Sequence, residues 1–351
     1  MKELIEKIRA NQRITKDEAI KLYKEADIYL LGSLANEIRN RLHPEPIVTY
    51  VIDRNINYTN ICISGCKFCA YFVPPNSPKG FVLSKEELKK KIDETLALGG
   101  TQILLQGGMN PDLPLSFYED MLSFIKKECP IHCHAFSPPE ITYMSQISNL
   151  SVEEVLKRLI KAGLDSIPGG GAEILVDRVR KIVSPRKATT DEWLHVMETA
   201  HKLGLKTSAT MMFGHVETIE ERIEHLIRIR ELQDKTHGFT AFIAWPFQPK
   251  NTRINVPGTT AIEYIRLIAI SRIVLDNIAN VQASWVTQGP KVAQIALYFG
   301  ANDFGSTMIE ENVVAATGVS HRLSEEQIRY FIKNAGFIPK QRLMDYTLVE
   351  D

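Results

Sequence analysis

Strand-like and helix-like segments alternate regularly from residue 49 to residue 308, and this alternation constrains the fold more than any other feature. The strand candidates are 49–57, 101–107, 131–137, 164–168, 206–213, 239–246, 281–287 and 302–308. The helical candidates between them are 84–98, 115–128, 151–162, 172–181 with 190–203, 217–234, 261–279 and 289–299. Strands that alternate with helices form a parallel sheet, and eight of them close a (β/α)8 barrel. The sequence therefore predicts a TIM-type (β/α)8 barrel, with an open (β/α)6 barrel as the alternative.

The segments on either side of this pattern look helical. Residues 3–42 have a helical pattern that Pro44 and Pro46 end, and Thr15 to Glu18 form a capping-box sequence. No repeat, low-complexity stretch or long linker divides the chain. We expect an N-terminal helical extension (1–45), one catalytic barrel (46–310) and a C-terminal helical segment packed on the barrel (311–351).

Composition is that of an ordinary globular protein, with 44% hydrophobic and 24% charged residues. The 42 Lys and Arg residues equal the 42 Asp and Glu residues, so bulk charge gives no reason to expect a nucleic-acid partner. No apolar run approaches the ~20 residues that span a membrane, and Met1 to Ala10 is charged and amphipathic, unlike a signal peptide. Five cysteines, three of them clustered, argue against a disulfide framework. We expect a cytoplasmic protein that binds neither membranes nor nucleic acid.

The clustered cysteines are Cys62, Cys66 and Cys69, spaced C-x3-C-x2-C on one loop after the first strand candidate. Thiolates bind iron–sulfur clusters, zinc or copper. A closed site needs four ligands, but this loop offers three, and Cys129 and Cys133 lie far along the chain. A [4Fe-4S] cluster on three thiolates leaves one iron open to a small molecule. The alternative is a zinc knuckle with a distant fourth ligand.

The pattern C-x3-C-x-Phe-C, early in an alternating chain, resembles the radical S-adenosylmethionine (SAM) superfamily. The resemblance implies a [4Fe-4S] cluster whose open iron binds SAM, and an electron that cleaves SAM to a 5′-deoxyadenosyl radical. It also implies an electron donor such as flavodoxin or ferredoxin. The cofactor carries such radical chemistry, while the protein binds and orients. Phe68 and Tyr71, beside the cysteines, are expected cofactor contacts.

Other candidate SAM contacts follow the second, third and fourth strand candidates, where barrel enzymes place their sites. The Gly-Gly pair after the second strand is similar to the segment that holds the SAM amino group, although it is also an ordinary turn sequence. The acidic residues of this set could contact SAM or simply stand in the first turn of a helix. The candidates are Gln106, Gly107, Gly108, Ser137, Glu140 and Glu173.

Three residues are candidate bases. Alternation along 131–136 should point His134 into the barrel, either as a functional group or as a hydrogen-bonded core histidine. His215 and Glu217 follow Gly214 at the end of the fifth strand, where proton-transfer groups would be useful.

Four longer segments narrow the resemblance to the cyclic dehypoxanthinyl futalosine synthase family of menaquinone biosynthesis. They are 53–60, 166–173, 211–217 and 301–306. The family resemblance implies an oxidoreductase that abstracts a ribose hydrogen from dehypoxanthine futalosine and adds the carbon radical to the benzoate ring, giving the cyclic product. The alternatives are aminofutalosine synthase or a deazaflavin-synthase-like enzyme. In another class, the alternative is a non-catalytic iron–sulfur or zinc-binding protein.

Overall fold

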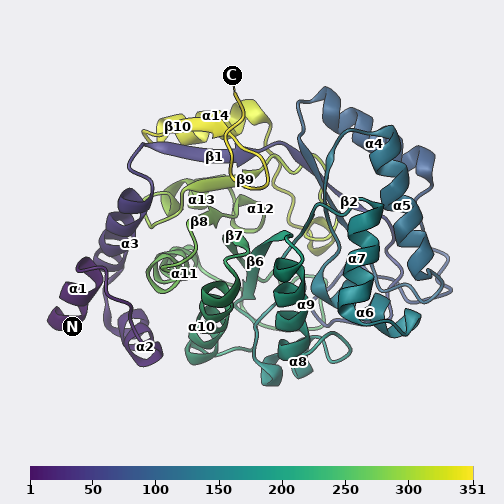
Figure 1. Ribbon diagram of the computed structural model, residues 1–351. Coiled ribbons are helices and arrows are strands. Elements are labelled where there is room, and N and C mark those ends of the chain that lie inside the picture. Colours follow the sequence, from purple (N-terminus) through teal and green to yellow (C-terminus); the bar gives the residue numbers. More distant parts are fainter. Residues whose placement is uncertain (351) are drawn as a thin grey trace.

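The computed structural model describes residues 1–350, and its centre is a curved sheet of parallel strands with helices outside it (Figure 1). The strands are β1 (Ile47–Val51), β2 (Asp53–Asn57), β3 (Gln102–Gln106), β4 (His132–Ala135), β5 (Ser166–Ile167), β6 (Lys206–Phe213), β7 (Phe239–Pro246), β8 (Asn280–Ala283), β9 (Asp303–Ser306) and β10 (Ile338–Gln341). The helices are α1 (Lys2–Arg9), α2 (Lys16–Glu25), α3 (Ile28–Leu42), α4 (Lys85–Ala97), α5 (Leu115–Glu128), α6 (Pro138–Ser148), α7 (Val152–Ala162), α8 (Asp177–Val183), α9 (Thr190–Lys202), α10 (Ile219–Thr236), α11 (Ala261–Val274), α12 (Trp285–Gln288), α13 (Pro290–Ala296) and α14 (Glu325–Asn334).

One extended segment, 47–57, contains both β1, the second strand from one end of the sheet, and β2, the strand at the other end. The strand order is β10-β1-β9-β8-β7-β6-β5-β4-β3-β2, and β1 and β2 are separated only by Ile52. The Ile52 carbonyl accepts a hydrogen bond from the Thr101 amide at 3.2 Å, before β3, while the Val51 carbonyl accepts one from the Thr307 amide at 3.0 Å, after β9. The predicted parallel barrel-type fold is therefore confirmed, with ten strands in the curled sheet where eight were expected. The expected first strand is split because its two halves pair with different neighbours.

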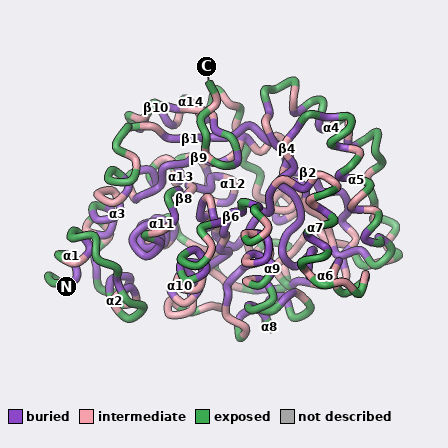
Figure 2. The backbone as a smooth tube through the Cα atoms, viewed as in Figure 1, coloured by how far each residue is buried: buried purple, intermediate pink, exposed green. Residues whose placement is uncertain are grey.

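Alternation along the strands decides what fills the barrel. In β6, Ala209 and Met211 are buried, whereas Ser208 and Thr210 line the interior cavity. Buried backbone runs through the strands, and exposed positions collect on the outer helices (Figure 2). Small polar side chains on the inner face leave open space where many barrels are packed with branched apolar residues.

The N-terminal helices pack on the outside of the barrel. The capping box predicted at Thr15 and Glu18 is present at the start of α2. Arg13 forms ion pairs with Asp234 at 2.6 Å and Asp276 at 2.8 Å, and α3 packs against α11. No helix within residues 1–350 is long and apolar enough to cross a membrane.

Two regions differ from the sequence-based expectation. In place of a wholly helical segment over 311–351, the chain forms α14 and then β10, which pairs with β1 and adds a strand to the sheet. Helix α6 was not predicted, although Ser137 caps it, prolines occupy its first turn and Glu140 completes a capping box. Proline at the first helical position is favourable because its missing N–H has no helical partner there.

Candidate functional site

The cysteine loop lies at one end of an interior cavity. Cys62 and Cys66 are buried, Cys69 is half-buried, and none of the three forms a disulfide in the described chain. The Met109 amide donates to the Cys62 sulfur at 3.3 Å, and the Ser64 hydroxyl lies 3.0 Å from Cys62 Sγ and 3.3 Å from Cys66 Sγ. The three candidate ligands therefore sit on a loop that the protein itself holds in place.

The electrostatics of these thiols suit metal ligation. Burial raises the pKa of Cys66 to about 11 and raises the pKa of Cys69 as well. Metal binding is the usual way in which such buried thiols lose their protons. Among residues 1–350, no group of three His, Cys, Asp or Glu side chains converges to hold a single ion. An iron–sulfur cluster does not require that convergence, because its thiolates bind separate irons, so the arrangement fits a cluster better than a zinc knuckle.

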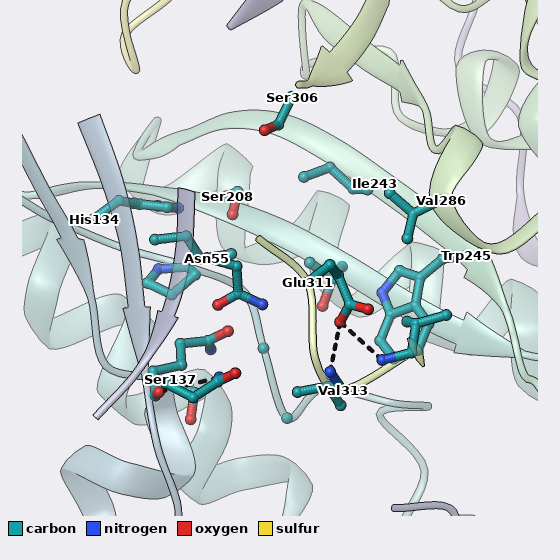
Figure 3. Close-up of a pocket in the computed structure, with 18 of the residues that line it drawn as sticks. Asn55, His134, Ser137, Ser208, Ile243, Trp245, Val286, Ser306, Glu311 and Val313 are labelled. Carbon is teal, nitrogen blue, oxygen red and sulfur yellow. Dashed lines mark hydrogen bonds between the residues drawn. The ribbon is translucent and has the colours of Figure 1, made fainter. Parts of the chain in front are cut away.

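The cavity extends from the cysteine loop into the barrel and has a volume of about 390 Å³. Figure 3 shows Asn55, His134 and Ser137 on one side of it and Ile243, Trp245 and Val286 on the other. Every residue expected from the sequence to contact the cofactor lines this cavity, namely Phe68, Tyr71, Gln106, Gly107, Gly108, Ser137, Glu140 and Glu173. The structure thus gathers residues from several strand ends around one space.

Both carboxylate oxygens of Glu140 accept hydrogen bonds from other groups of the protein. Its Oε1 accepts hydrogen bonds from the Tyr58 hydroxyl at 2.7 Å and the Gly107 amide at 3.0 Å. Its Oε2 accepts from the amide and hydroxyl of Ser137 at 2.7 and 2.6 Å. Glu140 therefore stands in the first turn of α6 and fixes Gly107 and Ser137 relative to each other.

The two glycines after β3 are required by contacts within the protein. A Cβ on Gly107 would lie 2.4 Å from the Tyr58 ring, and one on Gly108 would lie 2.1 Å from the Ile61 carbonyl oxygen. Real Cβ atoms do not come this close, so each glycine lets a neighbouring segment pack. Gly108 in particular permits the approach of the segment that leads into Cys62.

Glu173 has the opposite character to Glu140. Its Oε1 accepts from the Lys187 ammonium at 2.9 Å, but its buried Oε2 has no hydrogen-bond partner. Lys187 also lies over the Phe68 ring, 5.1 Å from the centroid. Burial acts to lower the pKa of Lys187, but the charges of Cys66 and Glu173 outweigh it and raise the pKa. A buried carboxylate oxygen without a partner is expected where a ligand supplies one.

The candidate bases separate into two groups. His134 lines the cavity, as strand alternation predicts, and its Nδ1 lies 2.7 Å from the Ser166 hydroxyl. His215 and Glu217 do not line it. Glu217 accepts from the Gly214 amide at 2.6 Å and from Arg222 at 2.7 Å, while His215 Nε2 contacts the Met212 carbonyl at 3.0 Å. These two residues hold the loop between β6 and α10.

Lys187, Asn55 and Glu311 are among the cavity residues that sequence reasoning missed. Lys187 gives no sequence signal, since an isolated lysine is usually a surface charge. Asn55 stands between Asp53 and Asn57 in an alternating strand, and that polar face could have marked it. Glu311 accepts hydrogen bonds from three consecutive backbone amides, those of residues 313–315, and Figure 3 shows the bond from Val313. Such a turn is visible only in the folded chain.

Comparison with known families assigns both parts of the chain. Residues 56–229 match the family described as "Radical SAM superfamily", and residues 236–351 match "CofH/MqnC C-terminal region". A relative named cyclic dehypoxanthine futalosine synthase, from Halalkalibacterium halodurans, is 47% identical over 99% of this chain and 94% of its own. Another of that name, from Streptomyces coelicolor, is 44% identical over 98% of this chain and 87% of its own. An Archaeoglobus fulgidus relative is named 5-amino-6-(D-ribitylamino)uracil–L-tyrosine 4-hydroxyphenyl transferase. It is 43% identical over 90% of this chain and 93% of its own.

Solved structures support the fold. The hydrogenase maturase HydG from Carboxydothermus hydrogenoformans has a TM-score of 0.78 at 17% identity, covering 98% of this chain and 80% of that one. Methylornithine synthase has a TM-score of 0.75 at 16% identity, covering 96% and 97%. At such low identity these structures show a shared architecture only.

Proposed function

This chain belongs to the radical SAM superfamily and, within it, to the family of the cyclic dehypoxanthine futalosine synthases, and on that premise we propose that it converts dehypoxanthine futalosine into its cyclic product in menaquinone biosynthesis. Two relatives of that name match almost the whole chain at 44–47% identity. In this proposal the enzyme is an oxidoreductase, because the substrate loses hydrogen overall when the ring closes.

One structural observation carries the proposal. Cys62, Cys66 and Cys69 share a cavity with Glu173, a buried carboxylate that has one oxygen unpartnered. Three thiols on a fixed loop suit a cluster with an open iron, and the unsatisfied oxygen beside them suits a polar ligand. When bound, a [4Fe-4S] cluster with SAM supplies a 5′-deoxyadenosyl radical, which starts the reaction.

The remaining work falls to the residues of the chain. The three cysteines hold the cluster, while Phe68, Tyr71, Gln106 and Glu173 form the SAM side of the cavity. A cavity of about 390 Å³ lies in the range of small-molecule sites. Its polar and apolar sides suit a substrate that carries both a ribose and an aromatic ring. Enclosure within the barrel keeps a radical away from solvent.

Electrons must come from outside the chain. We propose a flavodoxin or ferredoxin as the donor, because the cysteine loop is not deeply covered. Lys67, between Cys66 and Cys69, is exposed, and Cys69 is only half-buried. A small redox protein can therefore approach the cluster ligands at this end of the barrel.

The test is a substrate assay on protein reconstituted with iron and sulfide under anaerobic conditions. With SAM, dithionite and dehypoxanthine futalosine, we expect 5′-deoxyadenosine and a cyclic product detected by mass spectrometry. Cys66→Ser should lose the brown chromophore and both products, whereas the matched variant Cys133→Ser, at a buried cysteine outside the loop, should keep them. 5′-Deoxyadenosine without cyclic product from the intact enzyme would contradict the assigned substrate.

A second candidate function follows from the Archaeoglobus fulgidus relative, which is named as a 4-hydroxyphenyl transferase and is 43% identical to this chain. The same assay with tyrosine and 5-amino-6-(D-ribitylamino)uracil separates the two. Turnover of that pair, and none of dehypoxanthine futalosine, would favour the transferase.

A further inference from the structure

Three side chains form an unbroken hydrogen-bonded chain from the cavity toward the amino end of the barrel. His134 Nδ1 lies 2.7 Å from the Ser166 hydroxyl, and the same hydroxyl lies 2.7 Å from His132 Nε2. His132 and His134 belong to β4, and Ser166 opens the neighbouring β5, in direct register with His134. Ser166 is fully buried and His134 is 8% exposed, while His132 is only partly buried.

The central hydroxyl gives this chain a direction. Ser166 Oγ carries one hydrogen, so it can donate to one imidazole only while it accepts from the other. If His134 Nδ1–H donates to Ser166 and Ser166 donates to His132, then His134 Nε2 is an acceptor. His134 lies in the wall of the cavity, and within residues 1–350 its Nε2 forms no hydrogen bond. Figure 3 shows His134 beside Ser208 and Asn55 at this wall.

The other carboxylates and imidazoles either form hydrogen bonds within the protein or lie at the cysteine end of the cavity. Both oxygens of Glu140 and of Asp53 accept hydrogen bonds from the protein, and Glu173, whose Oε2 is free, is paired with Lys187 next to the cysteine loop. Glu311 holds three backbone amides. His215 is buried away from the cavity. Of the candidate proton acceptors, His134 is therefore the one with a ring nitrogen available at the cavity wall.

We propose that His134, Ser166 and His132 form a proton relay that carries the proton lost from the aromatic ring of the substrate to solvent. The proposal rests on the proposed function. The ring C–H bond breaks and its proton passes to His134 Nε2, the proton on Nδ1 passes to Ser166 Oγ, and the serine proton passes to His132 Nε2. His132 then releases its Nδ1 proton to water. The accompanying electron leaves the ring for a one-electron acceptor of the iron–sulfur class.

The charges around the two histidines agree with this direction. Burial, together with smaller effects of His132 and Arg342, lowers the pKa of His134 to about 3, so the imidazolium form of His134 is disfavoured at neutral pH. Burial also lowers the pKa of His132, but Asp165 and Asp345 favour its charged form against the opposing effect of Lys126. A proton that reaches His134 is therefore passed on, because the positive charge of a protonated imidazole is favoured by nearby carboxylates at His132 and not at His134.

Substitution of the central hydroxyl tests the relay. Ser166→Ala breaks the chain while leaving both histidines, so the cyclic product formed per 5′-deoxyadenosine should fall about tenfold or more, since positioned proton transfer contributes ~10²–10⁴-fold. Ser166→Thr restores a hydroxyl and should restore the ratio. His132→Gln should resemble Ser166→Ala, which keeps the test open if either Ser166 variant fails to fold. Ser271→Ala removes a buried serine hydroxyl on α11 and should leave the ratio unchanged.

A second measurement needs neither cofactor nor substrate. In ¹⁵N-histidine spectra of the apo protein at neutral pH, His134 should be neutral with its proton on Nδ1, and Ser166→Ala should change the tautomer balance of His134 and His132. If the wild-type enzyme makes no cyclic product, the proposed function fails. If it does, but Ser166→Ala and His132→Gln keep the wild-type ratio, the relay is refuted and the function stands.

Discussion

The ammonium of Lys187 lies 2.9 Å from Glu173 Oε1, close to Cys66, and Glu173 is buried with its second carboxylate oxygen left free, while Lys187 is partly exposed. Glu173 follows the glycine-rich end of β5 in a left-handed conformation (φ 42°), while Lys187 comes from the loop between α8 and α9. The ion pair thus joins two loops at the cavity and leaves one carboxylate oxygen of Glu173 without a hydrogen-bond partner.

Removing the lysine should therefore destabilise the protein strongly. Lys187→Met keeps the unbranched stem of the side chain but leaves the Glu173 charge buried and unpaired, which typically costs about 3–5 kcal/mol. We expect this loss in the free energy of unfolding of the apo protein, measured by denaturant titration. In the double variant Lys187→Met/Glu173→Gln no charge remains unpaired, so part of the loss should be recovered. A double variant no more stable than Lys187→Met would show that the pair is not coupled.

The approach of the chain after β3 to the cysteine loop leads to a second prediction. Gly108→Ala places a Cβ against the Ile61 carbonyl, so the segment carrying Cys62 must shift. We expect a destabilisation of about 1–3 kcal/mol, as for other overpacked sites, and a lower iron content after reconstitution. Gly204→Ala is the control, because a Cβ there meets nothing although the backbone is strained (φ 89°). Equal iron contents in the two variants would contradict the prediction.

Much of this architecture could be read from the sequence, and the exceptions have physical causes. The alternation of strands and helices located all eight strand regions, since period and length are local properties, although the predicted strand 281–287 extends into α12. The break at Ile52 is not local: it depends on Val51 pairing toward β9 and Ile52 toward β3. The same is true of β10, whose pairing partner β1 lies almost 300 residues earlier in the chain.

The candidate site divides along the same line. Cys62, Cys66 and Cys69 share one loop, so their spacing alone predicted a common site. His134 followed from alternation within one strand. His215 and Glu217 were placed by position after a glycine, but side-chain direction in a loop is set by partners such as Arg222, which the sequence does not reveal. Lys187 reaches the cavity from a loop that no periodic pattern describes.

Buried neutral histidines should make the protein sensitive to acid. Burial lowers the pKa of His134 to about 3, that of His225 to about 3 and that of His201 to about 4. The unfolded chain takes up protons on these residues below pH 6.5, whereas the folded protein does not until the pH reaches 3–4. Because the unfolded state binds more protons, stability is present above pH 6.5 and is lost as the pH falls toward these folded values.

Between pH 7 and pH 5 the loss should be roughly 2 kcal/mol for each of these histidines. Denaturant titrations at the two pH values measure it directly. In His225→Gln the difference between pH 7 and pH 5 should shrink by about 2 kcal/mol, whatever the variant costs at neutral pH. An unchanged pH difference in this variant would show that His225 is already charged in the folded protein.

We expect the Asn55 side chain to lower the stability of the apo protein and to contribute to substrate binding. Its side chain faces the cavity from β2, is 6% exposed, and has a buried Oδ1 without a hydrogen-bond partner. A buried polar atom left unsatisfied costs about 1–3 kcal/mol, so Asn55→Leu, which has a similar shape and no polar atom, should leave the apo protein as stable or more stable. If the amide binds the substrate, the same change should lower kcat/KM by about tenfold or more, because it removes a hydrogen bond in a water-poor site.

Thermal unfolding of the apo protein and steady-state kinetics measure the two effects of Asn55→Leu. The variant Asn55→Asp, which keeps an acceptor but adds a charge, should lose both stability and activity. Unaltered kinetics in a folded Asn55→Leu protein would mean that the substrate does not contact this side chain.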